Sequence, residues 1–354
     1  MNRTKIALAG IAALAAGAAC AQSSVTLYGR VDAALARGTG SVSSMTQLKS
    51  SGYNASAIGF RGVEDLGGGM SASFVLEAGL NNDDGSGQGT STNNQPSGGS
   101  GGGGLTFNRQ STVSLAGSWG ELRFGRDYTP QFRIVSIFDA FGTDGVGTTQ
   151  TLMSPIGGMP TYVRASNSIA YLYNTNGWGH GSGFYGTVQH YMGENPSSAA
   201  NSSDGRGTGA LVGFGSGPFD VALAVSRTSY LSGDVRQNNV GGSWDFGAAK
   251  VMAHYASDSI GAVDGNGYLV GTHVPVGAGV IRASYSRYKL DSAGNPTTKK
   301  LALGYVHNLS KRTALYGTFA HVANSGGAAQ SLNGAVTAPN GSSNGYEFGV
   351  RHSF

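Results

Sequence analysis

The chain ends in a segment whose side chains alternate between two kinds of surface. Between Asn344 and Phe354, one side carries aromatic and aliphatic groups and the other carries small or charged groups. The first set is Tyr346, Phe348, Val350, His352 and Phe354, and the second is Glu347, Gly349, Arg351 and Ser353. Such alternation is the pattern of a β-strand with one face toward lipid or a core and the other toward water.

The start of the chain has the form of an export signal. Residues 1–5 are a short basic region, residues 6–16 are apolar but too short to span a bilayer as a helix, and residues 19–21 fit a small-x-small cleavage site. The sequence therefore predicts a signal peptide at 1–21 and a mature protein that begins at Gln22.

Cys20 is the only cysteine, so cleavage after Ala21 leaves a mature chain with no disulfide and no thiolate metal site. An alternative makes Cys20 a lipidated first residue, but Gly17 stands where a lipoprotein signal has an aliphatic residue. Removing Arg3 and Lys5 reduces 23 basic residues to 21 against 19 acidic ones, so the net charge falls from +4 to +2. This balance and the scattered basic positions argue against nucleic acid as a partner.

Composition limits the fold further. The chain has 60 glycines and only 12% charged residues, and no apolar run after Ala16 approaches the ~18 residues of a membrane helix. These features leave a glycine-rich β-solenoid or a transmembrane β-barrel. A solenoid needs a short fixed repeat, and the sequence has none.

Segments of about ten residues with alternating polarity recur along the chain, as outer-membrane barrels require. Sixteen can be drawn, at 24–36, 55–65, 70–80, 105–117, 120–127, 163–174, 182–192, 207–215, 218–230, 235–247, 249–258, 264–274, 279–290, 297–308, 312–323 and 344–354. Short turns such as Gly215 to Pro218 alternate with long polar loops, so we expect the turns to face the periplasm and the loops to face outward. The fold prediction is all-β, a 16-stranded antiparallel transmembrane barrel formed by one domain, residues 22–354.

One connection differs from the others. Residues Tyr128 to Met159 form the longest loop, and the part from Thr129 to Phe141 resembles a short amphipathic helix opened by Thr and Pro. A long ordered loop in a compact protein is usually functional, although a plain surface loop with a helical turn is the alternative.

Six motifs occur in order along the chain: Ser24 to Arg30, Gly59 to Gly69, Phe107 to Gln110, Phe124 to Pro130, Leu303 to Thr313 and the terminal Arg351 to Phe354. On these motifs the chain resembles the trimeric general-diffusion porins of Gram-negative outer membranes, especially their anion-preferring branch. The resemblance implies a water-filled channel for small hydrophilic solutes and inorganic ions, with no cofactor and no enzymatic activity. It also implies a homotrimer, contact with outer-membrane lipid and lipopolysaccharide, and assembly machinery that reads the terminal aromatic, here Phe354.

In that family the third extracellular loop folds into the lumen and narrows it to an eyelet. By this resemblance, Arg30, Arg109 and Arg164 occupy wall positions, and Asp139 and Asp144 are the acids available on the loop. The wall position at Ala57, which is often basic in the family, is not basic here, and the acidic Pro-Glu-Phe-Gly-Gly motif of many relatives is absent.

Strand alternation tests the facing of these arginines, because an arginine on the lipid side near the midplane costs ~2–4 kcal/mol. Four arginines pass the test and are expected to face inward. The fifth fails it, because its position in the alternation places it on the lipid side with Val113 and Leu115. The four are Arg30, Arg61, Arg123 and Arg164. Arg109 is the fifth, and a β-bulge would be needed to turn it inward. The alternative role for each is a solvated lumen residue paired with a nearby carboxylate.

Enzymatic and binding functions are the other possibilities. The seven histidines are spread singly, no Gly-x-Ser-x-Gly elbow is present, and no carboxylates cluster, so hydrolytic and metal-dependent chemistry have little support. A substrate-specific channel would favour aromatic residues along the lumen, whereas the three tryptophans fall at turns or strand ends. An adhesin that uses the long loops stays open.

Overall fold

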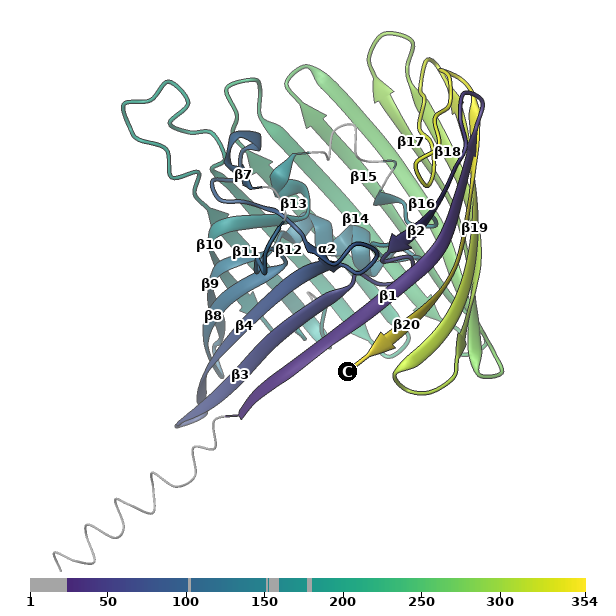
Figure 1. Ribbon diagram of the computed structural model, residues 1–354. Helices are drawn as coiled ribbons and strands as arrows, with labels where there is room; N and C mark the ends of the chain where they lie inside the picture. Colours follow the sequence, from purple (N-terminus) through teal and green to yellow (C-terminus); the bar gives the residue numbers. More distant parts are fainter. Residues whose placement is uncertain (1–23, 101–102, 151, 153–158, 177–179) are drawn as a thin grey trace, which may run out of the picture.

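A computed structural model describes residues 24–100, 103–150, 152, 159–176 and 180–354. Its main feature is one large antiparallel β-sheet curled into a barrel (Figure 1). The predicted signal peptide and its cleavage site lie outside the described residues. No helix in the described residues is long and apolar enough to cross a membrane.

Sixteen long strands in the described residues form the wall, and each pairs antiparallel with the next. They are β1 (Ser24–Gly40), β3 (Ala57–Gly67), β4 (Met70–Asn81), β8 (Gln110–Gly117), β9 (Gly120–Tyr128), β10 (Arg164–Tyr173), β11 (Gly183–Tyr191), β12 (Gly207–Ser216), β13 (Phe219–Thr228), β14 (Val235–Asp245), β15 (Lys250–Ile260), β16 (Val263–Val276), β17 (Gly279–Asp291), β18 (Thr297–Asn308), β19 (Thr313–Ser325) and β20 (Ser342–Ser353). Because β1 pairs with both β3 and β20, the sheet closes and every long strand has two neighbours.

All sixteen predicted segments correspond to these strands, and two boundaries are wrong by more than three residues. The strand predicted from 105 begins at Gln110, and β1 continues to Gly40 rather than ending at 36. The upper part of β1 continues because β3 pairs with it only up to Arg30, and β2 (Met45–Ser50) folds back along Ala33 to Gly38. The sequence did not predict β2, nor the short elements β5 (Ser86–Gly87), β6 (Thr90–Ser91), η1 (Pro96–Gly98), β7 (Gly99–Ser100) and η2 (Pro160–Tyr162).

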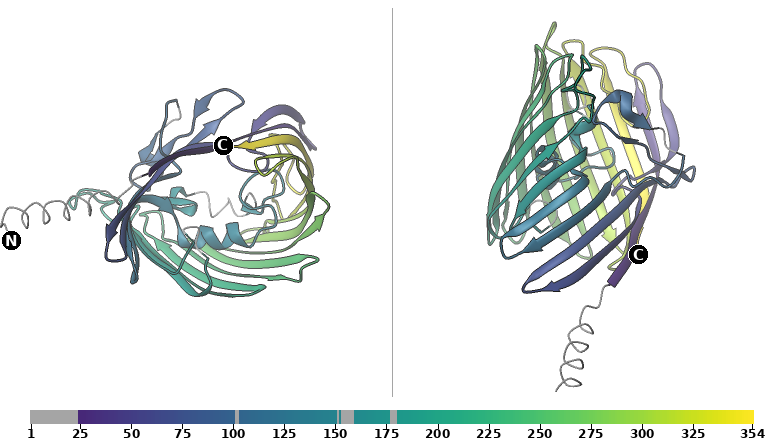
Figure 2. Two further views of the ribbon diagram at one scale, coloured as in Figure 1. Left: turned by 90° about the horizontal axis from the view of Figure 1, so that it is seen from below. Right: turned by 90° about the vertical axis from the view of Figure 1, so that its left-hand side faces the viewer.

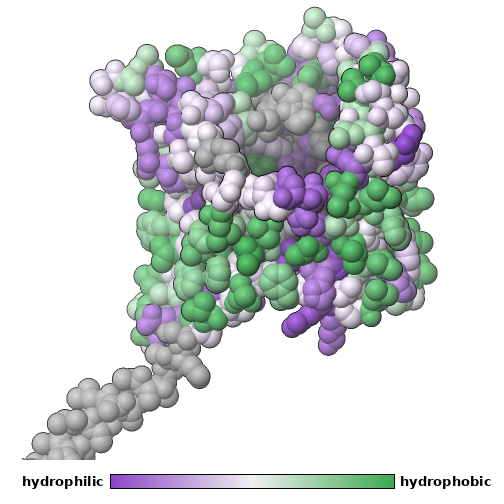
Figure 3. Space-filling view, viewed as in Figure 1, coloured by the Kyte–Doolittle hydropathy of each residue, from purple (hydrophilic) through white to green (hydrophobic). Residues whose placement is uncertain are grey.

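The strand faces follow the predicted alternation. On β20, Tyr346, Phe348 and Val350 are 47%, 65% and 44% exposed, whereas Glu347 is 3% exposed on the inner side. Hydrophobic side chains cover the lower part of the face formed by β1, β3 and β4, and a hollow opens above them (Figure 3). An apolar outer surface around a polar interior is the pattern of a barrel that lives in lipid.

The two ends of the barrel differ as predicted. Tight turns join the strands at one end, where β1 begins and the chain ends, and the long loops extend from the opposite end (Figure 1). The last residue also completes the closure. The Phe354 amide donates to the Gly29 carbonyl at 3.0 Å and the Gly29 amide donates to the Phe354 carbonyl at 3.1 Å.

Candidate functional site

The connection between β9 and β10 enters the barrel. Its helix α2 (Pro130–Ile137) starts after Thr129 with proline in the first turn, as predicted, and packs against β12, β13 and β14 on the inner wall (Figure 2). Ile134 and Phe138 of this connection are fully buried against side chains of the wall. Those side chains are Tyr185, Leu211, Ala222 and Ala224.

The helix ends earlier than the predicted Phe141. The carboxylate of Asp139 accepts hydrogen bonds from the amides of Phe141 at 2.8 Å and Thr149 at 2.7 Å. These bonds turn the chain into a compact loop, because they satisfy backbone groups that a longer helix would otherwise pair. Asp139 is therefore 4% exposed and serves the shape of the loop.

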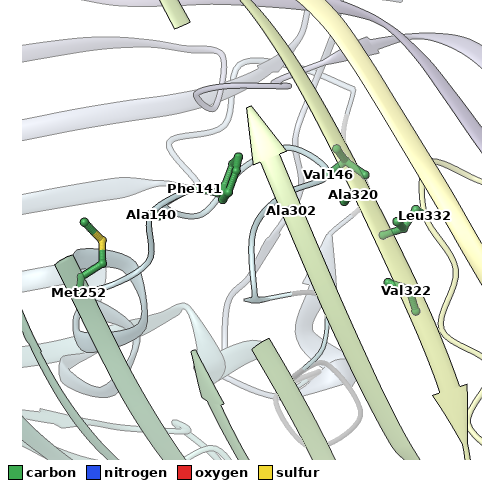
Figure 4. Close-up of a cluster of buried hydrophobic side chains, with 8 residues drawn as sticks. All are labelled: Ala140, Phe141, Val146, Met252, Ala302, Ala320, Val322 and Leu332. Carbon is green, nitrogen blue, oxygen red and sulfur yellow. The ribbon is translucent and has the colours of Figure 1, made fainter. Parts of the chain in front are cut away.

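The tip of the loop is bound to the wall further round the barrel. Ala140, Phe141 and Val146 pack into a hydrophobic cluster with side chains of β15, β18, β19 and the loop after β19 (Figure 4). Polar bonds reinforce this contact, since the Val146 amide donates to Glu347 Oε2 at 2.9 Å and Lys300 Nζ donates to the Thr148 carbonyl at 2.6 Å. The loop is therefore held against the inner wall at both its helix and its tip.

Three of the predicted arginines come together on the wall that faces the loop. Arg109 Nη2 and Arg164 Nη2 donate to the Tyr128 hydroxyl at 2.8 and 2.9 Å. Arg109 Nε also lies 2.6 Å from Glu77 Oε1, and Arg30 Nη2 lies 3.7 Å from the same oxygen. The result is a row of three guanidinium groups, in which Arg30 and Arg109 share the Glu77 carboxylate and Arg109 and Arg164 share the Tyr128 hydroxyl.

These groups border the space that the loop leaves open. Arg30, Arg109, Glu77, Asp139 and Asp144 line a cavity of ≈ 670 Å³. Arg164 lines an adjoining cavity of ≈ 250 Å³ together with Arg109 and Asp144. In the part of the chain that the structure describes, no group of three or more His, Cys, Asp or Glu residues is placed to hold a metal ion.

Arg109 faces inward although it breaks the alternation of its segment. It stands just before β8, which begins at Gln110, and its amide donates to the Glu77 carbonyl at 3.1 Å. The pairing of β4 with β8 has no register shift, so the expected bulge is not the reason. Strict alternation applies only inside the strand.

Arg61 and Arg123 lie away from the cavity. Arg61 is exposed and sits over the Tyr28 ring, 5.2 Å from its centre, and it pairs with Thr26, four residues from Arg30 on β1. Arg123 is 7% exposed and binds Glu121 Oε1 at 2.8 Å and Asp127 Oδ2 at 2.7 Å. Both have the inward parity predicted for them, but neither lines the cavity that holds the other three.

Two charged residues of the cavity wall were missed in the sequence. Glu77 lies on β4 and Arg282 lies on β17, with Arg282 4% exposed. The alternation that identified Arg30 also identifies Arg282, because Ile281 and Ala283 share the outward parity of Tyr285. No pattern in the sequence indicates that Glu77 pairs with Arg109.

Comparisons with known proteins agree with this architecture. The family model described as Gram-negative porin matches residues 7–327. Outer membrane porin protein 32 of Delftia acidovorans is 34% identical over the full length of both chains. An outer membrane porin protein of Bordetella pertussis is 29% identical and aligns with 89% of this chain and 93% of its own.

Solved structures give the same result. The anion-selective porin from Comamonas acidovorans superposes with a TM-score of 0.80 at 30% identity, covering 94% of this chain and 100% of that one. The trimer form of OmpT from Vibrio cholerae has a TM-score of 0.65 at 13% identity, covering 94% and 99%, and so shares the fold. The family resemblance drawn from the six motifs is thus confirmed, and the chain belongs to the Gram-negative porins, which are outer-membrane β-barrel channels and not enzymes.

Proposed function

We propose that this porin is a passive diffusion channel with a preference for anions, set where the loop between β9 and β10 faces the arginine row. The observation that carries the proposal is the row of Arg30, Arg109 and Arg164 along the two cavities, with Arg109 and Arg164 on the Tyr128 hydroxyl. The relative described as an anion-selective porin supports it. Asp144 on the loop supplies the opposing charge.

The expected selectivity is moderate. Four arginines line the two cavities, namely Arg30, Arg109, Arg164 and Arg282, against the carboxylates of Glu77, Asp139 and Asp144, so the surplus is 4 − 3 = +1. One charge at ~6 Å in a water-like dielectric shifts a passing monovalent ion by ~0.7 kcal/mol, or about threefold. Low-dielectric walls strengthen this effect and salt weakens it, so we expect a several-fold to tenfold chloride preference at low ionic strength.

Reversal potentials across a KCl gradient test the proposal. The wild-type channel should favour chloride, and an Arg30→Ala, Arg164→Ala double variant should lose or reverse that preference, because the surplus charge changes from +1 to −1. Arg61→Ala is the control, because Arg61 lies outside the lining of both cavities. A wild-type channel that favours potassium would overturn the proposal, and an unchanged double variant would place the selectivity in other residues.

We further propose that the channel assembles as a homotrimer that contacts lipopolysaccharide and is inserted by the barrel-assembly machinery. The apolar outer face of β1, with Leu27 54% and Leu35 61% exposed, offers a surface for a second copy. The relative solved in a trimer form supports the stoichiometry. Electrophoresis without heating should show an oligomer that dissociates on heating and carries bound lipopolysaccharide, and a monomer free of lipid would contradict both statements.

A further inference from the structure

Arg282 of the cavity wall is buried without an acceptor for its N–H groups. It is 4% exposed, and its Nε has no hydrogen-bond partner. Among the described residues, its guanidinium makes no hydrogen bond and has no carboxylate oxygen within 4.0 Å. The other buried arginines on the lumen side differ, since Arg109, Arg123 and Arg133 each contact a carboxylate. A buried charge without a partner is costly, so the position requires a compensating group.

Two aromatic rings fix the orientation of this guanidinium. Its Cζ lies 4.5 Å from the centre of the Tyr53 ring and 4.7 Å from the centre of the Phe141 ring. Arg351 contacts the Tyr53 ring at 5.1 Å and donates from Nη1 to Asn54 Oδ1 at 3.1 Å. Cation–π contacts of this kind hold an arginine in place without using its N–H groups.

The free N–H groups therefore border the lumen. Arg282 lines the same cavity of ≈ 670 Å³ as Arg30 and Arg109. The latter two already share Glu77, whereas Arg282 has no carboxylate of its own. A solute that enters the cavity thus finds one cation that is rigid, desolvated and unpaired.

We propose that Arg282 forms a binding site in the channel for small oxyanions, meaning a carboxylate or an inorganic phosphate, in preference to chloride. The planar fork of a guanidinium matches two oxygens of such an anion with two parallel hydrogen bonds, whereas a spherical halide gains no such match. This inference rests on the proposed anion preference and adds a ligand class and a residue to it. An anion bound there also supplies the acceptor that the folded chain lacks.

Chloride current through single channels tests the site, with inorganic phosphate or acetate added at constant ionic strength. In the wild type, one or both oxyanions should reduce the chloride current with saturation. In Arg282→Gln, the required concentration should rise by at least about tenfold, because a charge-assisted bidentate contact is lost. The oxyanion that reduces the chloride current at the lower concentration is the preferred ligand of the site. If neither acts on the wild type, or if Arg282→Gln responds like the wild type, the inference is wrong.

Two further variants separate the site from general charge and from folding. Arg282→Lys keeps the positive charge but loses the planar fork, so it should retain chloride preference over potassium while losing most of the oxyanion effect. Arg61→Gln removes a cation outside the cavity and should keep the full oxyanion effect. A wild type that favours potassium defeats the proposed function, whereas one that favours chloride but ignores both oxyanions defeats only this inference.

Discussion

Glu77 controls how much of the positive charge on the wall acts on the lumen. It contacts Arg109 at 2.6 Å and Arg30 at 3.7 Å, and it is 8% exposed. A single carboxylate cannot neutralise two guanidinium groups, so the row keeps a net positive charge. The same carboxylate also holds Arg109 in place through a short charge-assisted bond.

Replacing Glu77 with Gln should therefore raise the anion preference. The amide has nearly the same shape but removes one negative charge. At ~6 Å in a water-like dielectric this shifts chloride and potassium by ~0.7 kcal/mol in opposite directions, which raises the chloride-to-potassium permeability ratio about tenfold. Reversal potentials measure the change. Glu121→Gln is the matched control, because that carboxylate pairs with Arg123 away from the cavity. An equal rise in both variants would mean that the overall field of the lumen, and not this cavity, sets the selectivity.

We expect the loop between β9 and β10 to set the width of the channel. Its helix packs on β12 to β14, and its tip is hydrogen-bonded to Glu347 of β20 and Lys300 of β18. Glu347 Oε1 also forms an ion pair with Lys49 Nζ at 2.9 Å, so this one buried carboxylate connects β2, β20 and the loop. The position of the loop is thus fixed by bonds between residues that lie far apart in the sequence.

Glu347→Ala should loosen the loop tip. The Val146 amide would lose its acceptor, which costs ~1–3 kcal/mol at a buried position and weakens the anchoring by that amount. Liposome swelling with neutral sugars of increasing size should then show faster entry of the larger sugars. Glu64→Ala removes an exposed carboxylate of β3 and should leave the size dependence unchanged. The same size dependence for Glu347→Ala and the wild type would show that the hydrophobic cluster alone fixes the loop.

Closure of the sheet is a property of the whole molecule, and it depends on the first and last strands. β1 and β20 pair from Arg30 with Ser353 to Gly40 with Ser343. Phe354 extends this pairing by its two backbone bonds to Gly29, and its ring occupies the space where a Gly29 side chain would stand. Without this pairing of the first and last strands, the sheet would expose two unpaired edges to lipid.

Deletion of Phe354 should impair insertion, because the pairing of β1 with the end of the chain loses two hydrogen bonds and the proposed assembly machinery would lose the terminal aromatic that the family resemblance implies it reads. The truncated chain should accumulate in the periplasm or be degraded, which fractionation and immunoblotting measure. Phe354→Trp keeps an apolar aromatic at the end and should assemble. Normal surface levels of the truncated chain would count against this role.

The sequence by itself determined the strands and their faces. Alternation with a period of two is local, so the inward parity of Arg30 and Arg123 and the outward parity of Tyr346 and Phe348 could be read from neighbouring residues. The proline-led helix after Thr129 was also predictable from local signals.

Only the tertiary structure decided which charges meet. Arg61 and Arg30 share a face, but the stagger of the strands places only Arg30 at the cavity. Arg109 turns inward because its strand begins one residue later. Arg282 is held by rings from two distant loops, which contact its faces and leave its N–H groups without an acceptor. The parity of a residue within its strand tells which side of the sheet its side chain faces. The height of that side chain along the barrel axis and its charged partner depend on strand register and loop packing over the whole chain.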